Sequence, residues 1–249
     1  MNNTDNSLAY AWHKVQGKYS EDLAYKIINF ERIQKLRLTN VLDICCGSSN
    51  LLKIMLNENK RCFGTEINDE FMEFNKKEFP SVGYYKAESI LDIDKFKKFD
   101  LITLTNRMVN NIENLNDLGR FFELVYNHLS NGGVFIFDFY TKNQLKEWDE
   151  TKQTISDNIE LITNVKTNGN TSTITNTFYA KNGVTEDGQP KYYKSEIKDV
   201  KHHYNNETIS TLIKKAKFRY LISTNENFSP IPNINSSKTA YFIAIKRED

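Results

Sequence analysis

The sequence predicts an α/β fold, in which helices cover both faces of a mostly parallel sheet. Short apolar runs alternate with segments of helical periodicity through the first 140 residues, and this alternation is typical of parallel strands joined by helices. Two of the runs, 99–105 (FDLITLT) and 134–139 (VFIFDF), are rich in apolar residues and lack the regular alternation with polar ones. Such runs indicate strands that are buried on both faces of a sheet.

Each predicted element has a local signal. Ser20 is expected to cap the first helix, and Asn68 to cap the third. The Asn131-Gly132-Gly133 stretch is expected to end the helix before it. The expected elements, in chain order, are helix 20–36, strand 40–45, helix 49–58, strand 62–66, helix 69–79, strand 84–87, strand 99–105, helix 116–130, strand 134–139, a helical stretch at 142–148, helix 207–218 and strands 219–224 and 239–246.

The pattern changes between about residues 150 and 205, where β-forming residues alternate with polar ones. Asn168-Gly169, Asn182-Gly183 and Asp187-Gly188 are expected to form hairpin turns in this segment. We therefore expect a main domain of residues 1–145 and 206–249, with a small antiparallel β insertion at 150–205. An insertion that follows a sheet strand emerges at the edge where such folds bind ligands, which favours a lid over a decorative hairpin.

The composition is that of an ordinary globular protein. The chain of 249 residues is 39% hydrophobic and 26% charged, with a formal net charge of +1. This balance argues against a nucleic acid partner, because proteins that bind phosphate backbones usually carry a basic excess. Three cysteines without CxxC spacing indicate small structural residues and no metal site. The absence of a long apolar segment predicts a cytoplasmic protein without membrane association.

The turn after the first strand of the predicted sheet suggests a ligand without phosphates. It lies in VLDICCGSSN (41–50) and contains Gly47 alone, whereas a dinucleotide site needs the G-x-G-x-x-G pattern. A Walker loop is also absent. Glu66 ends the second strand, 19 residues after Gly47, where an acid accepts hydrogen bonds from ribose hydroxyls in nucleoside-binding folds. A nucleoside without phosphates suggests S-adenosylmethionine.

These stretches, together with AES (87–89), FDLITLTNRMVNNI (99–112) and HLSNGGVFIFDF (128–139), resemble the class I S-adenosylmethionine-dependent methyltransferases. The resemblance covers residues 40–140 and the terminal helix and strands. It is closest to small bacterial members with an antiparallel β insertion after the fifth strand. It implies a Rossmann-like seven-stranded sheet, a methyltransferase activity, S-adenosylmethionine as cofactor and S-adenosylhomocysteine as product.

The resemblance also implies roles for individual residues near the cofactor. Asp43 would face the methionine amino group, Glu66 would hold the ribose diol, and the other matching positions would line the cofactor. Those positions are Cys45 and Gly47 in the turn, Ile67, Glu88 and Ser89 beside the adenine, and Thr105 and Asn106 beside the methionine and methyl group. The pattern departs from the family at Ser49, where a glycine is usual, and at Cys45, where glycine or alanine is usual. We expect the Ser49 hydroxyl near the carboxylate end of the cofactor.

Methyl transfer is an in-line displacement that needs no catalytic triad and no metal, because the sulfonium already activates the methyl group. An amine or hydroxyl acceptor must lose a proton, so a general base can assist. The candidate bases are Tyr10, His13, Tyr19 and Tyr140. Tyr10 and Tyr19 also resemble an aromatic segment that closes over the cofactor.

The acceptor is less well defined by the sequence. The stretch TNRM (105–108) lacks the motif of DNA amino-base methyltransferases, and no cysteine is present there for C5 methylation. The leading hypothesis is therefore transfer to a nitrogen or oxygen of a small molecule or peptide. An RNA methyltransferase that uses Lys191, Lys194 and Lys198 is one alternative. The other is a protein that binds S-adenosylmethionine or a nucleoside without turnover. The sequence leaves open whether the protein is a monomer or a homodimer.

Overall fold

The computed structural model describes residues 7–93, 97–146, 149–156, 158–225, 228–230 and 239–247. Its main body is a seven-stranded sheet in the order β10-β11-β5-β4-β1-β2-β3. Five strands are parallel, and β11 runs antiparallel to both β5 and β10. The strands are β1 (Asn40–Ile44), β2 (Arg61–Glu66), β3 (Gly83–Lys86), β4 (Phe99–Leu104), β5 (Leu129–Tyr140), β10 (Tyr220–Thr224) and β11 (Thr239–Ile245). The predicted α/β class with a mostly parallel sheet is confirmed.

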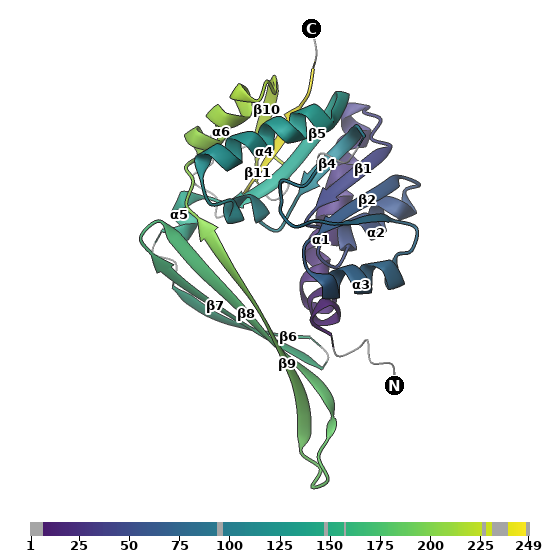
Figure 1. The fold of residues 1–249 in the computed structure, drawn as a ribbon, viewed down its shortest axis with the longest axis vertical. Coiled ribbons are helices and arrows are strands. Elements are labelled where there is room, and N and C mark those ends of the chain that lie inside the picture. The colour runs from purple at the N-terminus through teal and green to yellow at the C-terminus, as the bar shows by residue number, and fades with distance from the viewer. Residues whose placement is uncertain are drawn as a thin grey trace.

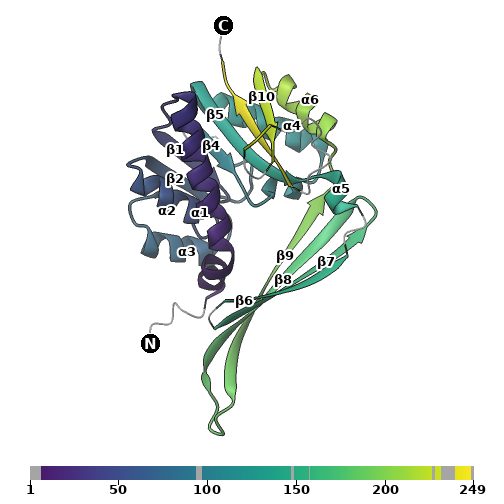
Figure 2. The ribbon, with the colours of Figure 1, turned by 180° about the vertical axis from the view of Figure 1, so that it is seen from behind.

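Helices cover both faces of this sheet (Figures 1 and 2). α1 (Leu8–Gln34) and α2 (Asn50–Asn57) pack on one face, and α4 (Leu115–His128) and α6 (Asn206–Lys215) pack on the other. The other helices in the described ranges are α3 (Asp69–Glu78), the short 3₁₀ helix η2 (Met108–Asn111) and α5 (Lys142–Leu145). None of the helices in the described ranges is long and apolar enough to cross a membrane.

Two helix boundaries differ from the prediction. α1 begins at Leu8 and is capped by Ser7, whose hydroxyl accepts from the Tyr10 amide at 3.1 Å, so Ser20 lies inside the helix. The early turns are stabilised by tertiary packing, because Leu8 and its neighbours are buried against α3 and the second sheet. α4 ends at His128, and the Asn131-Gly132-Gly133 stretch already belongs to β5.

A second, four-stranded antiparallel sheet follows β5. It has the order β6-β7-β8-β9 and consists of β6 (Glu150–Ser156), β7 (Ile159–Asn168), β8 (Thr171–Val184) and β9 (Pro190–His202). The predicted turns at Asn168-Gly169 and Asp187-Gly188 are present. The predicted turn at Asn182-Gly183 is wrong. These residues lie inside β8, where the pairing register shifts between Lys181 and Val184 as in a β-bulge.

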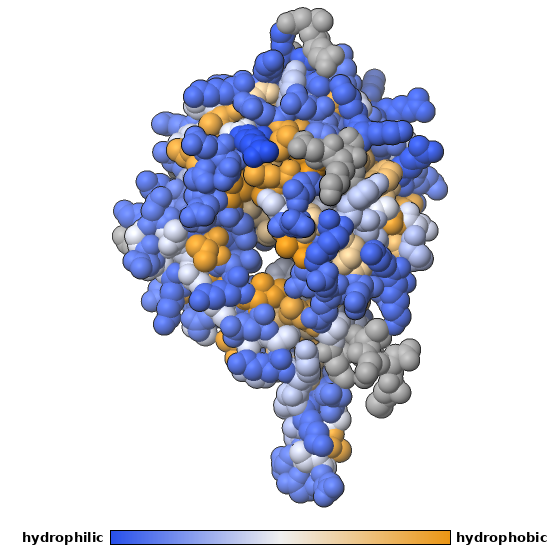
Figure 3. Space-filling model, viewed as in Figure 1, coloured by the Kyte–Doolittle hydropathy of each residue, from blue (hydrophilic) through white to orange (hydrophobic). Residues whose placement is uncertain are grey.

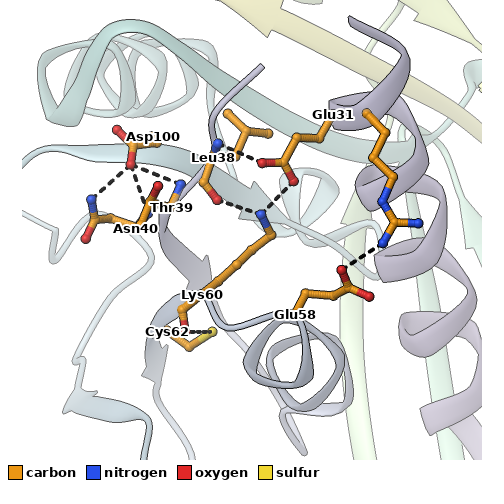
Figure 4. A network of polar contacts seen from close by, with 9 residues as sticks. Glu31, Leu38, Thr39, Asn40, Glu58, Lys60, Cys62 and Asp100 are labelled. Atoms are coloured by element: carbon orange, nitrogen blue, oxygen red, sulfur yellow. Dashed lines mark hydrogen bonds and ion pairs between the residues drawn. The ribbon is translucent and has the colours of Figure 1, made fainter. Parts of the chain in front are cut away.

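Polar contacts fix the edge of the sheet that contains the amino ends of the parallel strands (Figure 4). The Asp100 carboxylate accepts from the backbone amide and the side-chain amide of Asn40, each at 2.9 Å. Lys60 donates to Glu31 of α1 at 2.6 Å and to the Leu38 carbonyl at 2.8 Å. These contacts tie β1 to β4 and to α1, so the other end of β1 has a fixed position.

Candidate cofactor site

The turn after β1 has an unusual backbone. Cys45, Gly47 and Ser49 all have left-handed φ angles, of 53°, 53° and 55°. This region is uncommon for residues other than glycine, and strained residues cluster at functional sites. The Cys45 and Cys46 side chains are buried, and burial raises the pKa of both thiols. The two cysteines are therefore protonated, and their small size suits the tight turn.

Glu66 holds this turn against the end of β2. Its Oε2 atom accepts from the Gly47 amide at 2.8 Å, and its Oε1 atom accepts from the amides of Ile67 and Asn68 at 2.8 and 2.9 Å. Burial raises the pKa of Glu66, and the three amide donors oppose this shift. A carboxylate has about four acceptor positions, so one position on Oε2 can still accept a ribose hydroxyl.

Asp43 is a buried acid for which the described part of the chain supplies no positively charged partner. Its side chain at the end of β1 is 1% exposed and accepts one hydrogen bond, from the Thr103 hydroxyl at 2.6 Å. Burial, together with the charges of Glu66 and Asp138, raises its pKa to about 7, and the Thr103 hydrogen bond opposes this shift. An uncompensated buried carboxylate is costly, and a cationic ligand would remove that cost.

A second buried acid, Asp138 of β5, was not singled out by the sequence reasoning. It accepts from the backbone amide of Arg107 at 2.9 Å, pairs with the Arg107 Nε at 3.4 Å and accepts from the Tyr19 hydroxyl. The Arg107 guanidinium lies 4.2 Å from the ring centroid of Tyr19. The signal was present in the sequence, because Asp138 is an acid within a buried apolar strand, as Asp43 is.

Ser49 is oriented differently from the expectation. Its hydroxyl is fully buried, accepts from the Tyr84 hydroxyl of β3 at 3.0 Å and lies 3.5 Å from the Cys46 Sγ. The hydroxyl therefore points into the protein between α2 and the sheet, and it is not placed for a ligand on the open side of the turn. What Ser49 contributes to the site is its strained backbone, which keeps the conformation expected of a glycine.

The residues predicted to contact adenine lie after β2 and β3. Ile67 is 41% exposed, which is high for a large apolar side chain beside a site. Glu88 is exposed, and the backbone amides of Glu88 and Ser89 donate to the Asp92 carboxylate at 2.8 and 3.0 Å. The Ser89 amide is therefore already bonded within its own loop. The roles of these residues toward adenine remain predictions.

The turn after β4 is a second strained segment. Asn106 and Arg107 both have φ angles of 58°. Thr105 is buried, and its carbonyl accepts from the Met108 amide at 3.3 Å. Asn106 lines a cavity, whereas Thr105 lies below it at the end of the strand. The structure therefore places Asn106 and Arg107 in the wall of this cavity.

The N-terminal part of α1 covers the first turn through Trp12 and Gly17. A Cβ atom on Gly47 would lie 3.8 Å from the Trp12 Nε1, and one on Gly17 would lie 2.2 Å from the Asn50 Nδ2. The predicted base His13 points at Asn50, with Nδ1 and Oδ1 3.0 Å apart, and burial lowers its pKa. Trp12 and Gly17 bring the helix onto the turn, and neither has a local sequence signal for that role.

The second sheet is fastened to the turn after β4. The Lys201 ammonium donates to the Asn111 side-chain oxygen at 2.5 Å, and the Asn111 amide donates to Asp199 at 3.1 Å. The side-chain amide of Asn110 donates to the His202 carbonyl at 3.0 Å. β9 therefore holds η2, the segment that follows Asn106 and Arg107.

A polar cavity of about 250 Å³ lies between this turn, α1 and the second sheet. Figure 3 shows hydrophobic side chains around a hollow between the two sheets. Of the four candidate bases, Tyr140 lines the cavity, whereas Tyr10, His13 and Tyr19 do not. The cavity is lined by Trp12, Gln16, Asn106, Arg107, Tyr140, Glu150, Lys152, Thr154, Leu161, Thr163, Ile174, Asn176, Asp199 and Lys201.

Comparison with known families identifies the domain that carries this site. Residues 42–135 match the family model described as a methyltransferase domain. The match spans β1 to β5 and therefore includes Asp43, Glu66 and the turn after β4. No curated protein sequence matches the chain.

Solved structures share the fold over almost the whole chain. A S-adenosylmethionine-dependent methyltransferase from Clostridium acetobutylicum superposes with a TM-score of 0.78 at 20% identity, covering 91% of this chain and 92% of that one. DesVI from Streptomyces venezuelae gives 0.71 at 15% identity, with 92% of each chain covered. The sugar N-methyltransferase KedS8 from Streptoalloteichus gives 0.69 at 14%, covering 92% and 87%. The matches extend beyond residues 42–135 into the second sheet, and the predicted fold is confirmed.

Proposed function

We propose that this protein is an enzyme that transfers a methyl group from S-adenosylmethionine to a nitrogen or oxygen of a small polar molecule. The observation that carries the proposal is Asp43, a buried acid at the carboxyl edge of the sheet with negative neighbours. A ligand with a positive amino group and a sulfonium complements this charge. A related structure, CalS10 from Micromonospora echinaspora, is described as bound to S-adenosylmethionine and supports the same cofactor.

The residues at the edge of the sheet fit the parts of this cofactor. Asp43 would bind the amino group, Glu66 would accept from a ribose hydroxyl with its remaining position, and the exposed face of Ile67 would pack on the adenine. Glu88 and Ser89 would complete the adenine side, and Cys45 and Gly47 would present backbone to the methionine. The bound cofactor supplies an electrophilic methyl group on a positively charged sulfur.

The protein has to align the acceptor with that methyl group and exclude water. The second sheet, residues 150–205, would act as the lid that does both. Its cavity wall includes Lys152, Lys201, Glu150 and Asp199, so a polar acceptor fits it better than an apolar one. Two structures with the same fold, the sugar N-methyltransferase KedS8 and the glycopeptide N-methyltransferase MtfA, are consistent with an acceptor amine.

Proton removal from the acceptor would fall to the carboxylates of the cavity. Burial raises the pKa of Tyr140, so this residue would donate a hydrogen bond to the acceptor and would not act as a base. Tyr19 donates to Asp138, and burial raises its pKa as well. Glu150 and Asp199 are the negative groups that line the cavity.

RNA is a less suitable acceptor. Lys194 and Lys198 lie on the face of β9 that points away from the cavity, because alternate residues of a strand point to opposite faces and Lys201 faces the cavity. Lys191 lies on the other face from Lys194. These lysines therefore do not form one basic surface that leads to the site.

A transfer assay with methyl-labelled S-adenosylmethionine tests the proposal. The substrate panel would contain small amines and amino sugars, peptides and total RNA. We expect label in the small-molecule fraction and a large loss of rate in Asp199→Asn. Asp187→Asn, in the exposed turn between β8 and β9, is the matched control and should keep the wild-type rate. Label in RNA alone, or tight cofactor binding without transfer to any fraction, would contradict the proposed acceptor.

A further inference from the structure

Among the residues that the structure describes, β9 forms a long edge of the second sheet with one open side. It pairs with β8 and lies at the end of the four-stranded sheet. The pairing of β7 with β8 stops at Ile159 and Ala180, so β8 and β9 continue alone as a two-stranded arm (Figures 1 and 2). An isolated two-stranded hairpin is marginally stable, and a long open edge is a template for another strand. Tyr192 and Tyr193 on this strand are 54% and 43% exposed.

The hydrogen bonds at the end of β9 show which residues face outward. The His203 amide donates to the Asn170 carbonyl on the β8 side, whereas the His202 carbonyl accepts from Asn110 on the opposite side. Backbone groups of successive strand residues point alternately to the two sides. The even-numbered residues from Tyr192 to Val200 therefore present their amides and carbonyls to the open edge.

We propose that β9 pairs antiparallel with β9 of a second copy of this chain, around a two-fold axis at Ser195. In this register each even-numbered residue of β9 faces an even-numbered residue of the other copy, as the outward-facing amides and carbonyls require. Lys194 lies opposite Glu196 of the partner subunit, and Lys191 lies opposite Asp199 of the partner subunit. Tyr193 lies opposite Ile197 of the partner subunit, an aromatic and β-branched pair. The two-fold axis repeats each of these pairs, and opposite charges at facing positions stabilise a sheet.

The neighbouring registers are less favourable. With the axis at Lys194, this lysine faces the Lys194 of the partner subunit. With the axis at Glu196, this glutamate faces the Glu196 of the partner subunit, and Lys194 faces the Lys198 of the partner subunit. An axis at Ile197 keeps a single kind of opposite-charge pair, Glu196 with Lys198. Like charges at facing positions destabilise a sheet, so the charge pattern of β9 selects the axis at Ser195.

The pairing would make one eight-stranded sheet from the two four-stranded sheets, and the arm would gain neighbours along its open side. The ladder ends at Asp199, before the position where Asn110 covers the edge at His202. Asp199 lines the cavity, so Lys191 of the partner subunit would lie beside the acceptor site. This last consequence, and only this one, rests on the proposed function.

The molar mass in solution tests the pairing without any activity measurement, so its failure and the failure of the proposed function are distinguishable. Light scattering and sedimentation of the full chain should give twice 29.1 kDa at micromolar concentrations. Lys194→Glu should weaken the dimer at least tenfold, because it places two acids opposite each other on both sides of the axis. Adding Glu196→Lys to that variant should restore the dimer. Lys166→Glu, an exposed lysine of β7, is the control and should leave the mass unchanged.

A backbone variant gives an independent test. The Glu196 amide points to the open edge, so Glu196→Pro removes an intermolecular donor without removing a bond to β8. This variant should be a folded monomer by circular dichroism and sedimentation. A wild-type protein that stays monomeric over the whole concentration range would overturn the proposal. A dimer that all the variants leave unchanged would overturn it as well.

Discussion

Replacing Asp43 with asparagine should stabilise the protein at high pH while weakening its cofactor site. The pKa of Asp43 is raised to about 7 in the folded protein, from the ordinary aspartate value near 3.9 in the unfolded chain. The folded state therefore binds more protons between these values, and stability falls as the pH rises from about 4 to about 7. A shift of about 3 units corresponds to about 4 kcal/mol above pH 7 as an upper bound.

Asparagine keeps the acceptor for the Thr103 hydroxyl and carries no charge. At pH 8 without cofactor, Asp43→Asn should therefore unfold at a higher temperature than the wild type, by at most roughly 8–16 °C at about 2–4 °C per kcal/mol for a chain of this size. At pH 4 and below, where Asp43 is protonated in the folded state and largely protonated in the unfolded chain, the difference should nearly vanish. Differential scanning calorimetry at both pH values measures the difference in unfolding temperature between the variant and the wild type.

The same variant should bind S-adenosylmethionine at least tenfold more weakly, because it loses a charge-assisted hydrogen bond of about 1.5–3 kcal/mol. Asp100→Asn is the matched control, since Asp100 accepts three hydrogen bonds at the other end of the sheet. It should lower the stability at both pH values and leave the affinity unchanged. An Asp43→Asn protein that is less stable than the wild type at pH 8, or that keeps full affinity, would refute the reasoning.

Three further substitutions test single contacts. Gly17→Ala should destabilise the protein by about 1–3 kcal/mol and weaken cofactor binding, because the new Cβ would lie 2.2 Å from the Asn50 amide nitrogen. Denaturant unfolding measures the loss of stability, and calorimetry measures the loss of affinity. Ser49→Gly should be more stable than Ser49→Ala by about 1 kcal/mol, since both remove the hydroxyl but glycine alone relieves the left-handed backbone, and equal stability would contradict this strain. Tyr19→Phe should keep the shape of the pH–rate profile, because Tyr19 donates to Asp138 and is not the base. A variant whose rate no longer depended on pH at one end of the profile would contradict this.

The sequence identified the strand-end acids because their signal is local. Asp43 and Glu66 each end an apolar run, and a buried acid is costly unless it has a partner. Asp138 has the same signal within VFIFDF but was missed, because the strand as a whole looked like simple core. The structure shows that it organises Arg107 and Tyr19.

Other features could not be predicted, because they depend on contacts between distant segments. Trp12 reaches the first turn only through the packing of α1, and Lys201 reaches the cavity only through the pairing of β9 with β8. The first half of α1 is stabilised by the second sheet, so no local cap near Ser20 marks its start. Asn182-Gly183 has the sequence of a hairpin turn, but a glycine with a left-handed backbone conformation, as Gly183 has, is also typical of a β-bulge.

Calorimetric titration of the wild-type protein with S-adenosylmethionine, S-adenosylhomocysteine and NAD tests the central claim most directly. The acidic edge formed by Asp43 and Glu66 predicts binding of both sulfur nucleosides at one site per chain, with the positively charged S-adenosylmethionine gaining from Asp43. The single glycine of the turn predicts no binding of NAD, whose pyrophosphate the turn cannot accept. Binding of NAD without binding of S-adenosylmethionine would contradict the account.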